Sequence, residues 1–334
     1  MNVPMIYSNI NMTLSHYSDH CFASACVIYA VCMILLVFEL GSSRVQKLEA
    51  RDAERELVAA GGVRVATVGT PGLVVPTGPK RSRSERLGRM GYAVLVAGWL
   101  VQVASIVLRG FATHRLPWGN MYEFVTITTA GAVLVGLITL RKSELRPMLV
   151  FILLPVLILL GVAGKLLYTD AGPVVPALKS YWLAIHVTIV SIGSGIFLVS
   201  GVASMMFLVR RRFDGRELPG GVLGRIIDRL PSSKALDRLA YTTVIVAFPL
   251  FSGGVICGAI WAESAWGRFW GWDPKETVSF IAWVVYAAYL HARATAGWRN
   301  SRAAWINMAG FATMIFNLFV INYVVSGLHS YAGG

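Results

Sequence analysis

The sequence is short of charged residues, and this shortage excludes most classes of soluble protein. Charged residues make up 14% of the 334 positions, whereas 56% are hydrophobic and the mean hydropathy is +0.62. A water-soluble domain of this length does not combine so much apolar sequence with so little charge. We therefore expect an integral membrane protein.

Cysteines are also few, and their spacing excludes further functions. The chain has four, at Cys21, Cys26, Cys32 and Cys257, and no two of them form a CxxC pair. This spacing argues against a thioredoxin-like redox centre or a zinc site and favours buried small apolar side chains. The sequence also lacks a phosphate-binding Walker loop, a dinucleotide-binding fingerprint and internal repeats. We expect no short signal peptide, because the first apolar run begins near residue 21 without a basic leader.

Long apolar segments dominate what is present. Eight of them are long enough to cross about 30 Å of hydrocarbon as helices. They lie near residues 20–40, 90–109, 120–140, 147–167, 181–209, 239–261, 274–292 and 303–326. The third and fourth are separated only by RKSELR and should form a tight hairpin. These segments predict an all-α polytopic membrane protein with about eight transmembrane helices.

The basic residues predict how the chain is oriented. Of the 30 lysines and arginines, 24 lie in one alternating set of loops, at residues 41–89, 141–146, 210–238 and 292–302. The positive-inside rule makes this set cytoplasmic and places both termini outside. The net charge of +13 is then explained by topology and anionic lipid, and no nucleic-acid partner is expected.

Three regions follow from this topology. Residues 1–40 form an outer tail and the first transmembrane helix, and residues 41–89 form a basic cytoplasmic linker with a charged helical start. Residues 90–334 form a seven-helix membrane domain. The inner loop 210–238 contains GVLGRIIDRL, whose apolar residues recur at helical spacing between arginines, so we expect an interfacial amphipathic helix there. Glycine-rich runs such as Gly193-Ser-Gly195 and Gly253–Gly254 are interpreted as points of close helix packing.

The segment between the sixth and seventh spans, residues 261–276, is rich in aromatic residues. It reads WAESAWGRFWGWDPKE and contains Trp261, Trp266, Phe269, Trp270 and Trp272. Such density gives a rigid π-rich surface suited to a flat hydrophobic ligand, although a tryptophan belt at the membrane surface is the alternative. Asp273, Pro274 and Glu276 have the pattern of an N-cap, a first-turn proline and a capping box.

Three of the six histidines lie at the ends of predicted spans. His186 is near the outer end of the fifth span, and His329 follows the eighth span on the same side. His291 lies near the inner end of the seventh, about 26 Å along the helix from Pro274. Each alone is more readily explained as an interfacial histidine, but two imidazoles at the level of an aromatic surface suit axial ligation of heme iron. The others lie in polar outer segments, where solvated side chains are expected: His16, His20 and His114.

The aromatic stretch and the histidines together resemble a known family. WGRFWGWDPKE is similar to the WGxxWxWDxxE signature, the WWD motif, of heme-handling membrane proteins. The segments AIHVTIVSIGSG, YLHAR and GLHSY around the three histidines, and PWGNMYEF before the third span, are similar to the CcsA/ResC branch, called CcsB in some bacteria. This branch is the membrane component of system II cytochrome c biogenesis. The resemblance covers most of residues 110–334.

The resemblance implies a ligand and a site. The ligand would be heme b, with His186 and His329 as the axial ligands of its iron and His291 as a transient contact during its passage across the membrane. The tryptophan motif would supply further contacts from Trp266, Gly267, Trp270, Trp272, Asp273 and Glu276. Arg268 and Lys275 are the nearest cations, and either pair with heme propionates or anchor the segment at the interface.

The resemblance also implies a function and its partners. The chain would take heme across or from the membrane, hold it at the outer site and present it to the thiols of an apocytochrome c CXXCH segment. The implied partners are a ResB-type membrane protein with a large outer domain, apocytochrome c, and thiol-reducing thioredoxin-like proteins. Because this chain has only short outer loops, we expect synthase activity, of the heme lyase type, only in complex with the ResB-type partner. The expected location is the plasma membrane, with the site on its outer face.

Other functions fit the sequence less well. The system I proteins CcmC and CcmF share the tryptophan motif, but they differ in partners and length. A heme exporter or delivery protein stays an alternative to heme attachment. A b-heme electron-transfer subunit commonly carries two histidines on one helix about four turns apart, whereas the three candidates here lie on three helices. A transporter is disfavoured because the acidic residues within spans, Glu39 and Glu123, lie near helix ends.

Overall fold

The computed structural model describes residues 10–59, 83–141, 145–174, 178–295, 297–298 and 301–329, and every regular element in these ranges is a helix. The elements are α1 (Met12–Ala59), α2 (Arg83–Thr113), α3 (Met121–Thr139), the 3₁₀ turn η2 (Arg146–Met148), α4 (Leu149–Lys165), α5 (Tyr181–Arg212), α6 (Gly221–Arg229), α7 (Ser233–Trp266), α8 (Pro274–Ala294) and α9 (Ser301–Tyr323).

The prediction of an all-helical polytopic membrane protein is confirmed. Each of the eight predicted spans falls on one long helix. Within the described residues, seven helices are long and apolar enough to cross a membrane, and α8, which begins Pro-Lys-Glu-Thr, is not among them. The predicted amphipathic segment forms the short helix α6, and α3 and α4 make the expected hairpin.

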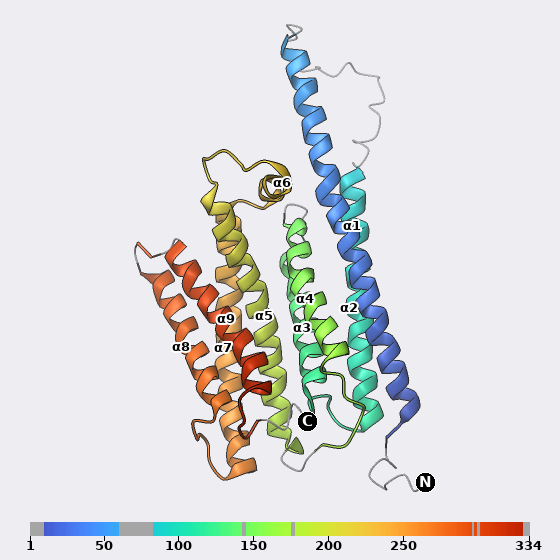
Figure 1. The fold of residues 1–334 in the computed structure, drawn as a ribbon, viewed down its shortest axis with the longest axis vertical. Coiled ribbons are helices and arrows are strands. Elements are labelled where there is room, and N and C mark those ends of the chain that lie inside the picture. The colour runs from blue at the N-terminus through green and yellow to red at the C-terminus, as the bar shows by residue number, and fades with distance from the viewer. Residues whose placement is uncertain are drawn as a thin grey trace, which may run out of the picture.

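The long helices stand side by side, and α5 lies near the middle of the bundle (Figure 1). Helix α1 packs along α2, and α3 packs against both α4 and α5. On the other side of α5, α7 makes the most extensive contact with it, and α8 is held mainly by α9. This order places α3, α5, α7, α8 and α9 around a common space.

The two ends of the bundle differ in chemistry. One end, called here the aromatic end, carries the start of α1, the segment 267–273 and His329. The opposite end, called the basic end, carries α6 and the last turn of α5, Arg210–Arg212 (Figure 1). Helix α1 continues beyond its apolar part, Met12–Leu40, as far as Ala59, so the charged start of the predicted linker is helical. The middle of that linker, residues 60–82, lies outside the described residues.

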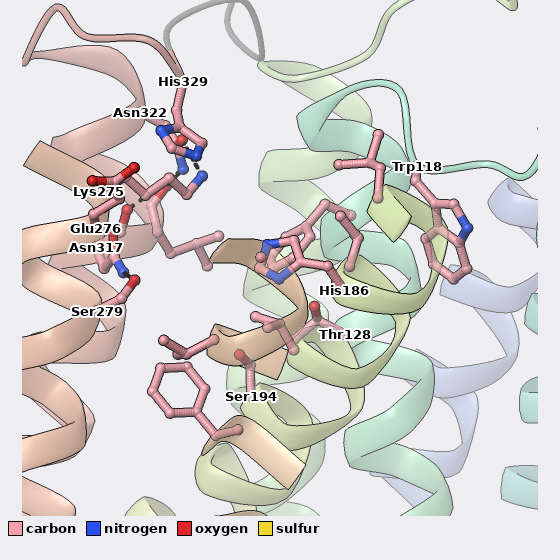
Figure 2. A pocket seen from close by; sticks show the side chains of 18 of the residues that line it. Trp118, Thr128, His186, Ser194, Lys275, Glu276, Ser279, Asn317, Asn322 and His329 are labelled. Carbon is pink, nitrogen blue, oxygen red and sulfur yellow. Dashed lines mark hydrogen bonds between the residues drawn. The ribbon is translucent and has the colours of Figure 1, made fainter. Parts of the chain in front are cut away.

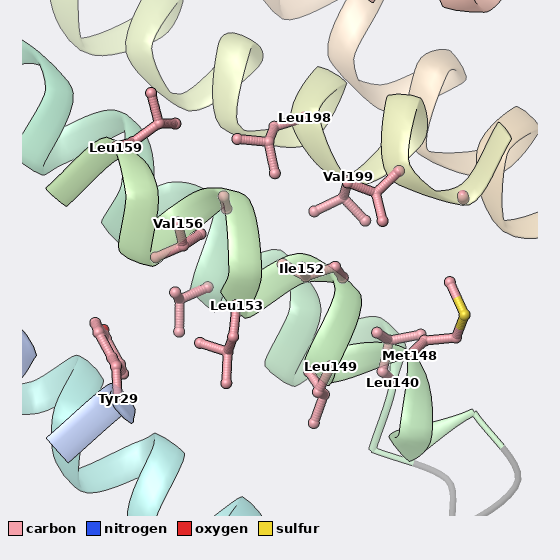
Figure 3. Packing of buried hydrophobic residues seen from close by; sticks show 14 of the residues in the cluster. Tyr29, Leu140, Met148, Leu149, Ile152, Leu153, Val156, Leu159, Leu198 and Val199 are labelled. Carbon is pink, nitrogen blue, oxygen red and sulfur yellow. The ribbon is translucent and has the colours of Figure 1, made fainter. Parts of the chain in front are cut away.

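Close packing between helices depends on small residues and interlocking apolar side chains. A Cβ atom on Gly195 of α5 would lie 2.6 Å from the carbonyl oxygen of Thr128 in α3, so only glycine allows this approach. A Cβ atom on Gly254 of α7 would lie 2.5 Å from Val190 of α5. The predicted packing role is thus confirmed at Gly195 and Gly254, as expected where lipid supplies no hydrophobic drive between helices. It is wrong for Gly253, where a Cβ atom would meet nothing within 4 Å. Figure 3 shows the apolar packing around α4, with Leu198 and Val199 of α5 on one side of it and Tyr29 of α1 on the other.

Candidate functional site

A cavity of about 180 Å³ opens among the helices at the aromatic end. Its walls come from α3, α5, α7, α8 and α9 and from the segments that connect them at this end. Figure 2 shows His186 on the α5 side of this cavity and His329 on the side of α8 and α9. The structure therefore brings together the two outer histidines that the sequence singled out, although they are 143 positions apart in the chain.

His186 is held in place by α7. Its Nδ1 atom lies 2.7 Å from the carbonyl oxygen of Gly254, and its ring is stacked nearly parallel to Trp261 at a centroid distance of 6.3 Å. A Cβ atom on Gly258 would lie 2.6 Å from the imidazole Cε1, so glycine at this position makes room for the ring. Because a carbonyl oxygen only accepts hydrogen bonds, Nδ1 carries the proton and Nε2 is the basic nitrogen.

His329 is held in place by the N-terminus of α8. Its Nδ1 atom lies 2.7 Å from Oδ2 of Asp273, and the backbone N–H of Leu328 donates to Oδ1 of the same carboxylate at 2.8 Å. Burial lowers the pKa of His329, and the hydrogen bond to Asp273 opposes this effect only in part. The imidazole is therefore neutral at pH 7, with the proton on Nδ1 and Nε2 as the basic nitrogen.

Asp273 stays ionised in this arrangement. Burial alone would raise the pKa of its carboxyl, but the hydrogen bonds from His329, Leu328 and Lys275 outweigh burial and lower the pKa to about 2. Asp273 is also the N-cap of α8, where its side chain accepts from the backbone N–H of Lys275 at 3.3 Å. One carboxylate thus starts a helix and orients a histidine.

The backbone of the aromatic stretch is fixed by two caps. Gly267, at φ +69°, ends α7 in the left-handed conformation that favours glycine. At the start of α8, Glu276 accepts from the backbone N–H of Asp273 at 3.2 Å and from that of Gly271 at 2.8 Å. The predicted capping box is therefore confirmed. Arg268 pairs with Glu276 at 3.2 Å, which ties the connecting segment to α8.

Most of the aromatic stretch faces the cavity, but Trp272 does not. The cavity is lined by Trp261, Trp266, Phe269 and Trp270. The rings of Trp261 and Trp266 also lie 6.0 Å and 5.1 Å from the ring of His329. Trp272 has an unusual positive φ of 57°, is 66% exposed, and packs edge-on against Trp270 outside the cavity lining.

Polar groups line the cavity wall formed by α8 and α9. Lys275 donates from Nζ to Oδ1 of Asn322 at 2.6 Å, and Asn317 donates to Ser279 at 2.8 Å (Figure 2). Among the described residues that line the cavity, Lys275 is the one lysine and there is no arginine. Of the two cations that the sequence offered as partners for an anionic ligand, Lys275 faces the cavity, whereas Arg268 pairs with Glu276.

Two of the other histidines named in the sequence lie away from this cavity. His291 sits in the last turns of α8 at the basic end, with an exposed side chain. His114 follows α2 at the aromatic end and is also exposed, outside the cavity lining. The structure therefore separates His291 from the two cavity histidines along the length of α8.

The segment before α3 forms part of the cavity wall, which residue-by-residue reasoning did not predict. Trp118 lines the cavity, and the loop that carries it is anchored by Glu123, which accepts from the backbone N–H of Gly119 at 2.7 Å. The carboxylate of Glu123 also pairs with Arg109 at 3.2 Å and with Arg115 at 2.9 Å. The signal in the sequence is the motif PWGNMYEF, which carries part of the family resemblance.

Comparison with known proteins agrees with this geometry. Residues 118–329 match the family described as "Cytochrome C assembly protein". The matched range begins at Trp118 and ends at His329, and both of these residues line the cavity. The chain belongs to this family.

Named members of the family match most of the chain. The cytochrome c biogenesis protein CcsA of Mesostigma viride is 33% identical over 272 residues, which are 75% of this chain and 88% of that protein. CcsA of Synechococcus sp. (strain RCC307) is 31% identical over 76% of this chain and 88% of its own length. CcsA of Synechococcus sp. (strain CC9311) is 32% identical over 78% and 93%. The resemblance to the CcsA branch is thereby confirmed.

A solved structure shares the fold. The structure of cytochrome c heme lyase CcmF superposes on 97% of this chain with a TM-score of 0.61, at 15% sequence identity. At this identity the likeness concerns the fold alone. The superposition takes up 50% of the CcmF chain, so the present protein spans about half the length of CcmF.

Proposed function

We propose that this protein holds heme for covalent attachment to apocytochrome c, as the membrane subunit of a heme-attachment complex. The observation that carries this proposal is the pair His186 and His329, which line one cavity with each Nδ1 hydrogen-bonded to an oxygen atom. In both rings Nε2 is then the nitrogen with a lone pair, as required of an axial ligand to heme iron.

The surroundings of the two imidazoles fit iron ligation. The contact between His329 and Asp273 has the form found in metal sites, where a carboxylate accepts from the second nitrogen of a ligating histidine and raises its basicity. Trp261, Trp266 and Trp270 offer apolar faces and edges to the macrocycle. Lys275, with its Nζ on the cavity wall, is suited to pair with a heme propionate.

The small size of the cavity supports a site that leaves part of the heme open. Its volume of about 180 Å³ is below the range of roughly 300–1,000 Å³ for pockets that enclose a drug-sized ligand. The cavity would take up the iron and part of the ring, while the remaining edge stays accessible. Phe269 and Trp272, which are 60% and 66% exposed, would border this open edge.

An open edge suits the chemistry of attachment. Each cysteine thiol of an apocytochrome CXXCH segment adds across one heme vinyl group: the sulfur bonds to one vinyl carbon and the thiol proton goes to the other. The addition consumes the C=C bond and requires no oxidant or reductant. The role of this chain is to hold the ring, orient it and shield its face, and the thiols come from the apocytochrome.

The direction of heme movement and the partners follow from the same proposal. The aromatic end faces the outer side of the plasma membrane, because the basic end carries most of the lysines and arginines. Heme enters from the cytoplasmic side past His291 and reaches the outer pair. A ResB-type membrane protein supplies the large outer domain that the short connections here do not provide, and thioredoxin-like proteins keep the apocytochrome thiols reduced.

The proposal is tested by an optical spectrum of the chain purified with its partner. We expect a low-spin b-type spectrum in the wild type and a changed spectrum in both His186→Ala and His329→Ala, because each variant removes one axial ligand. Added imidazole should restore the low-spin bands, since it can occupy the vacated coordination position. The matched control is His114→Ala, which removes an exposed histidine from the same end of the molecule.

Two outcomes would contradict the proposal. If the wild-type complex carries no heme after reconstitution, heme is not the ligand of this site. A spectrum unchanged in both cavity variants would show that other residues bind the iron, and would return the aromatic stretch to the alternative of a membrane belt.

A further inference from the structure

A second hollow lies at the basic end, far from the aromatic cavity. It has a volume of about 800 Å³ and lies between the last turns of α5 and the first turns of α9. Its lining combines arginines with apolar side chains: Met205, Leu208, Val209, Arg211, Arg212, Asp214, Arg216, Ser301, Trp305 and Met308. The proposed heme function does not use any of these residues.

Of the three arginines that line this hollow, Arg212 and Arg216 are not neutralised by any carboxylate among the described residues. In the part of the chain that the structure describes, no carboxylate lies within 4.0 Å of Arg212 or Arg216. Asp214, the one acidic residue of the lining, pairs with Arg210 at 3.7 Å and with Arg211 at 4.0 Å, and it accepts from Ser233 at 2.6 Å. The rim therefore has excess positive charge that can bind an anion.

The wall below the arginines is apolar and faces outward from the bundle. Trp305 of α9 is 64% exposed and Met205 of α5 is 43% exposed. Leu208 and Met308 continue the wall between them. Exposed apolar side chains on a transmembrane helix contact lipid chains, so the hollow has a polar rim above a surface suited to an acyl chain.

Helix α6 indicates the depth of this hollow relative to the lipid headgroups. Arg210, at the end of α5, donates to the carbonyl oxygen of Ile227 at 2.7 Å, and Ile227 is fully buried. The opposite face of α6 exposes Val222 and Leu223, which are 62% and 55% exposed. A short helix with an unburied apolar face beside arginines lies in the interface between headgroups and chains. Helix α6 lies at the same end of the bundle as the last turns of α5, which line the hollow, so the arginine rim is at the level of the headgroups (Figure 1).

Packing inside the bundle separates this hollow from the aromatic cavity. Asn307 of α9 donates to Ser200 and Ser204 of α5 at 2.8 Å and 2.7 Å, which clamps the two helices together. One turn further toward the aromatic end, Phe311 lies directly over Gly201, where a Cβ atom would be 2.4 Å from its ring. No histidine or cysteine lines the hollow at the basic end. These features favour a lipid over a second heme.

We infer that this hollow binds one anionic phospholipid from the leaflet at the basic end. The phosphodiester group lies between Arg212 and Arg216, and one acyl chain runs along Met205, Leu208 and Met308 with Trp305 at its side. Basic pockets between transmembrane helices at the headgroup level have the charge and shape for this class of ligand. The bound lipid bridges α5 and α9, which are the two helices that lead to His186 and His329.

Photocrosslinking of the full complex in lipid nanodiscs tests this inference. The probe is a phosphatidylglycerol with a photoreactive group on one acyl chain, and crosslinked peptides are mapped by mass spectrometry. We expect crosslinks in residues 205–209 and 301–308, with a probe affinity about 30-fold lower in Arg212→Gln/Arg216→Gln, as expected for the loss of two cations at a lipid surface. The control Arg225→Gln/Lys234→Gln removes the same charge from the same end and should label like the wild type.

A competition experiment on the wild type makes the test independent of how the variants fold. Excess unlabelled phosphatidylglycerol should suppress the crosslinks, whereas equal phosphatidylcholine should not. Equal suppression by both lipids would show ordinary contact with the surrounding bilayer and would overturn the inference. Suppression by added heme but not by phosphatidylglycerol would also overturn it, and would make the hollow a heme site. Equal labelling of the Arg212/Arg216 variant and the wild type would contradict the assigned residues.

Discussion

At the scale of single residues, Asp273 links the start of a helix to the orientation of a cavity histidine. Its two carboxylate oxygens receive hydrogen bonds from His329 and from the backbone N–H groups of Leu328 and Lys275. An aspartate at this position would be adequate as an N-cap even without the histidine. A substitution that keeps the N-cap can therefore test the contact between Asp273 and His329 by itself.

We expect Asp273→Asn to weaken heme binding by about 10- to 100-fold while leaving the fold intact, because asparagine keeps the N-cap but removes the charge and one acceptor oxygen. The measurement is the heme-to-protein ratio of the purified complex across a heme titration, together with its thermal unfolding midpoint. Asp170→Asn, an exposed substitution at the same end, is the control. Unchanged heme affinity in Asp273→Asn would show that the carboxylate has only a capping role.

At the scale of elements, a buried ion cluster joins α2, α3 and the loop that carries Trp118. Arg109 and Glu123 are each 2% exposed, and the carboxylate of Glu123 also binds Arg115 and the backbone of Gly119. Removing one partner of such a pair leaves a buried charge without compensation. The cluster therefore holds one wall of the aromatic cavity in place.

We expect Glu123→Gln to lower the free energy of unfolding by about 3 kcal/mol, because Arg115 would lose its counter-charge and Arg109 would keep only Asp19, which lies 3.5 Å away. The lowered stability should appear as a lower unfolding midpoint of the purified complex in detergent. Glu217→Gln, on an exposed loop at the basic end, is the matched control and should leave the midpoint unchanged. If both variants unfold at the same temperature, the cluster does not anchor the loop.

At the scale of the whole molecule, the difference in charge between the two ends predicts its orientation. We expect a cysteine introduced at Phe269 to react with a membrane-impermeant maleimide in intact cells, and one introduced at Arg225 to react only after permeabilisation. Both positions are exposed, and the background is a variant without the four native cysteines. The reverse pattern would place the histidine pair on the cytoplasmic side and exclude attachment on the outer face.

The sequence by itself determined the helices and the kind of site. Apolar runs of about 20 residues can satisfy their backbone hydrogen bonds in lipid only as helices, so hydropathy alone located every long helix. The capping box at Asp273 and the amphipathic helix α6 were also predictable, because both depend on neighbours within one turn. The motif around Trp266–Glu276 and three histidines indicated the family.

Only the tertiary structure decided which of these residues meet. His186 and His329 face one cavity for two reasons. Helix α5, which carries His186, packs between α3 and α7, and Asp273 at the start of α8 binds His329. Trp272, which has a positive φ, lies outside the cavity lining, although its neighbours in the motif line the cavity. Lys275 faces the cavity whereas Arg268 pairs with Glu276, a choice that the sequence left open. Such distinctions depend on side-chain direction and on contacts between helices far apart in the chain, which local pattern does not encode.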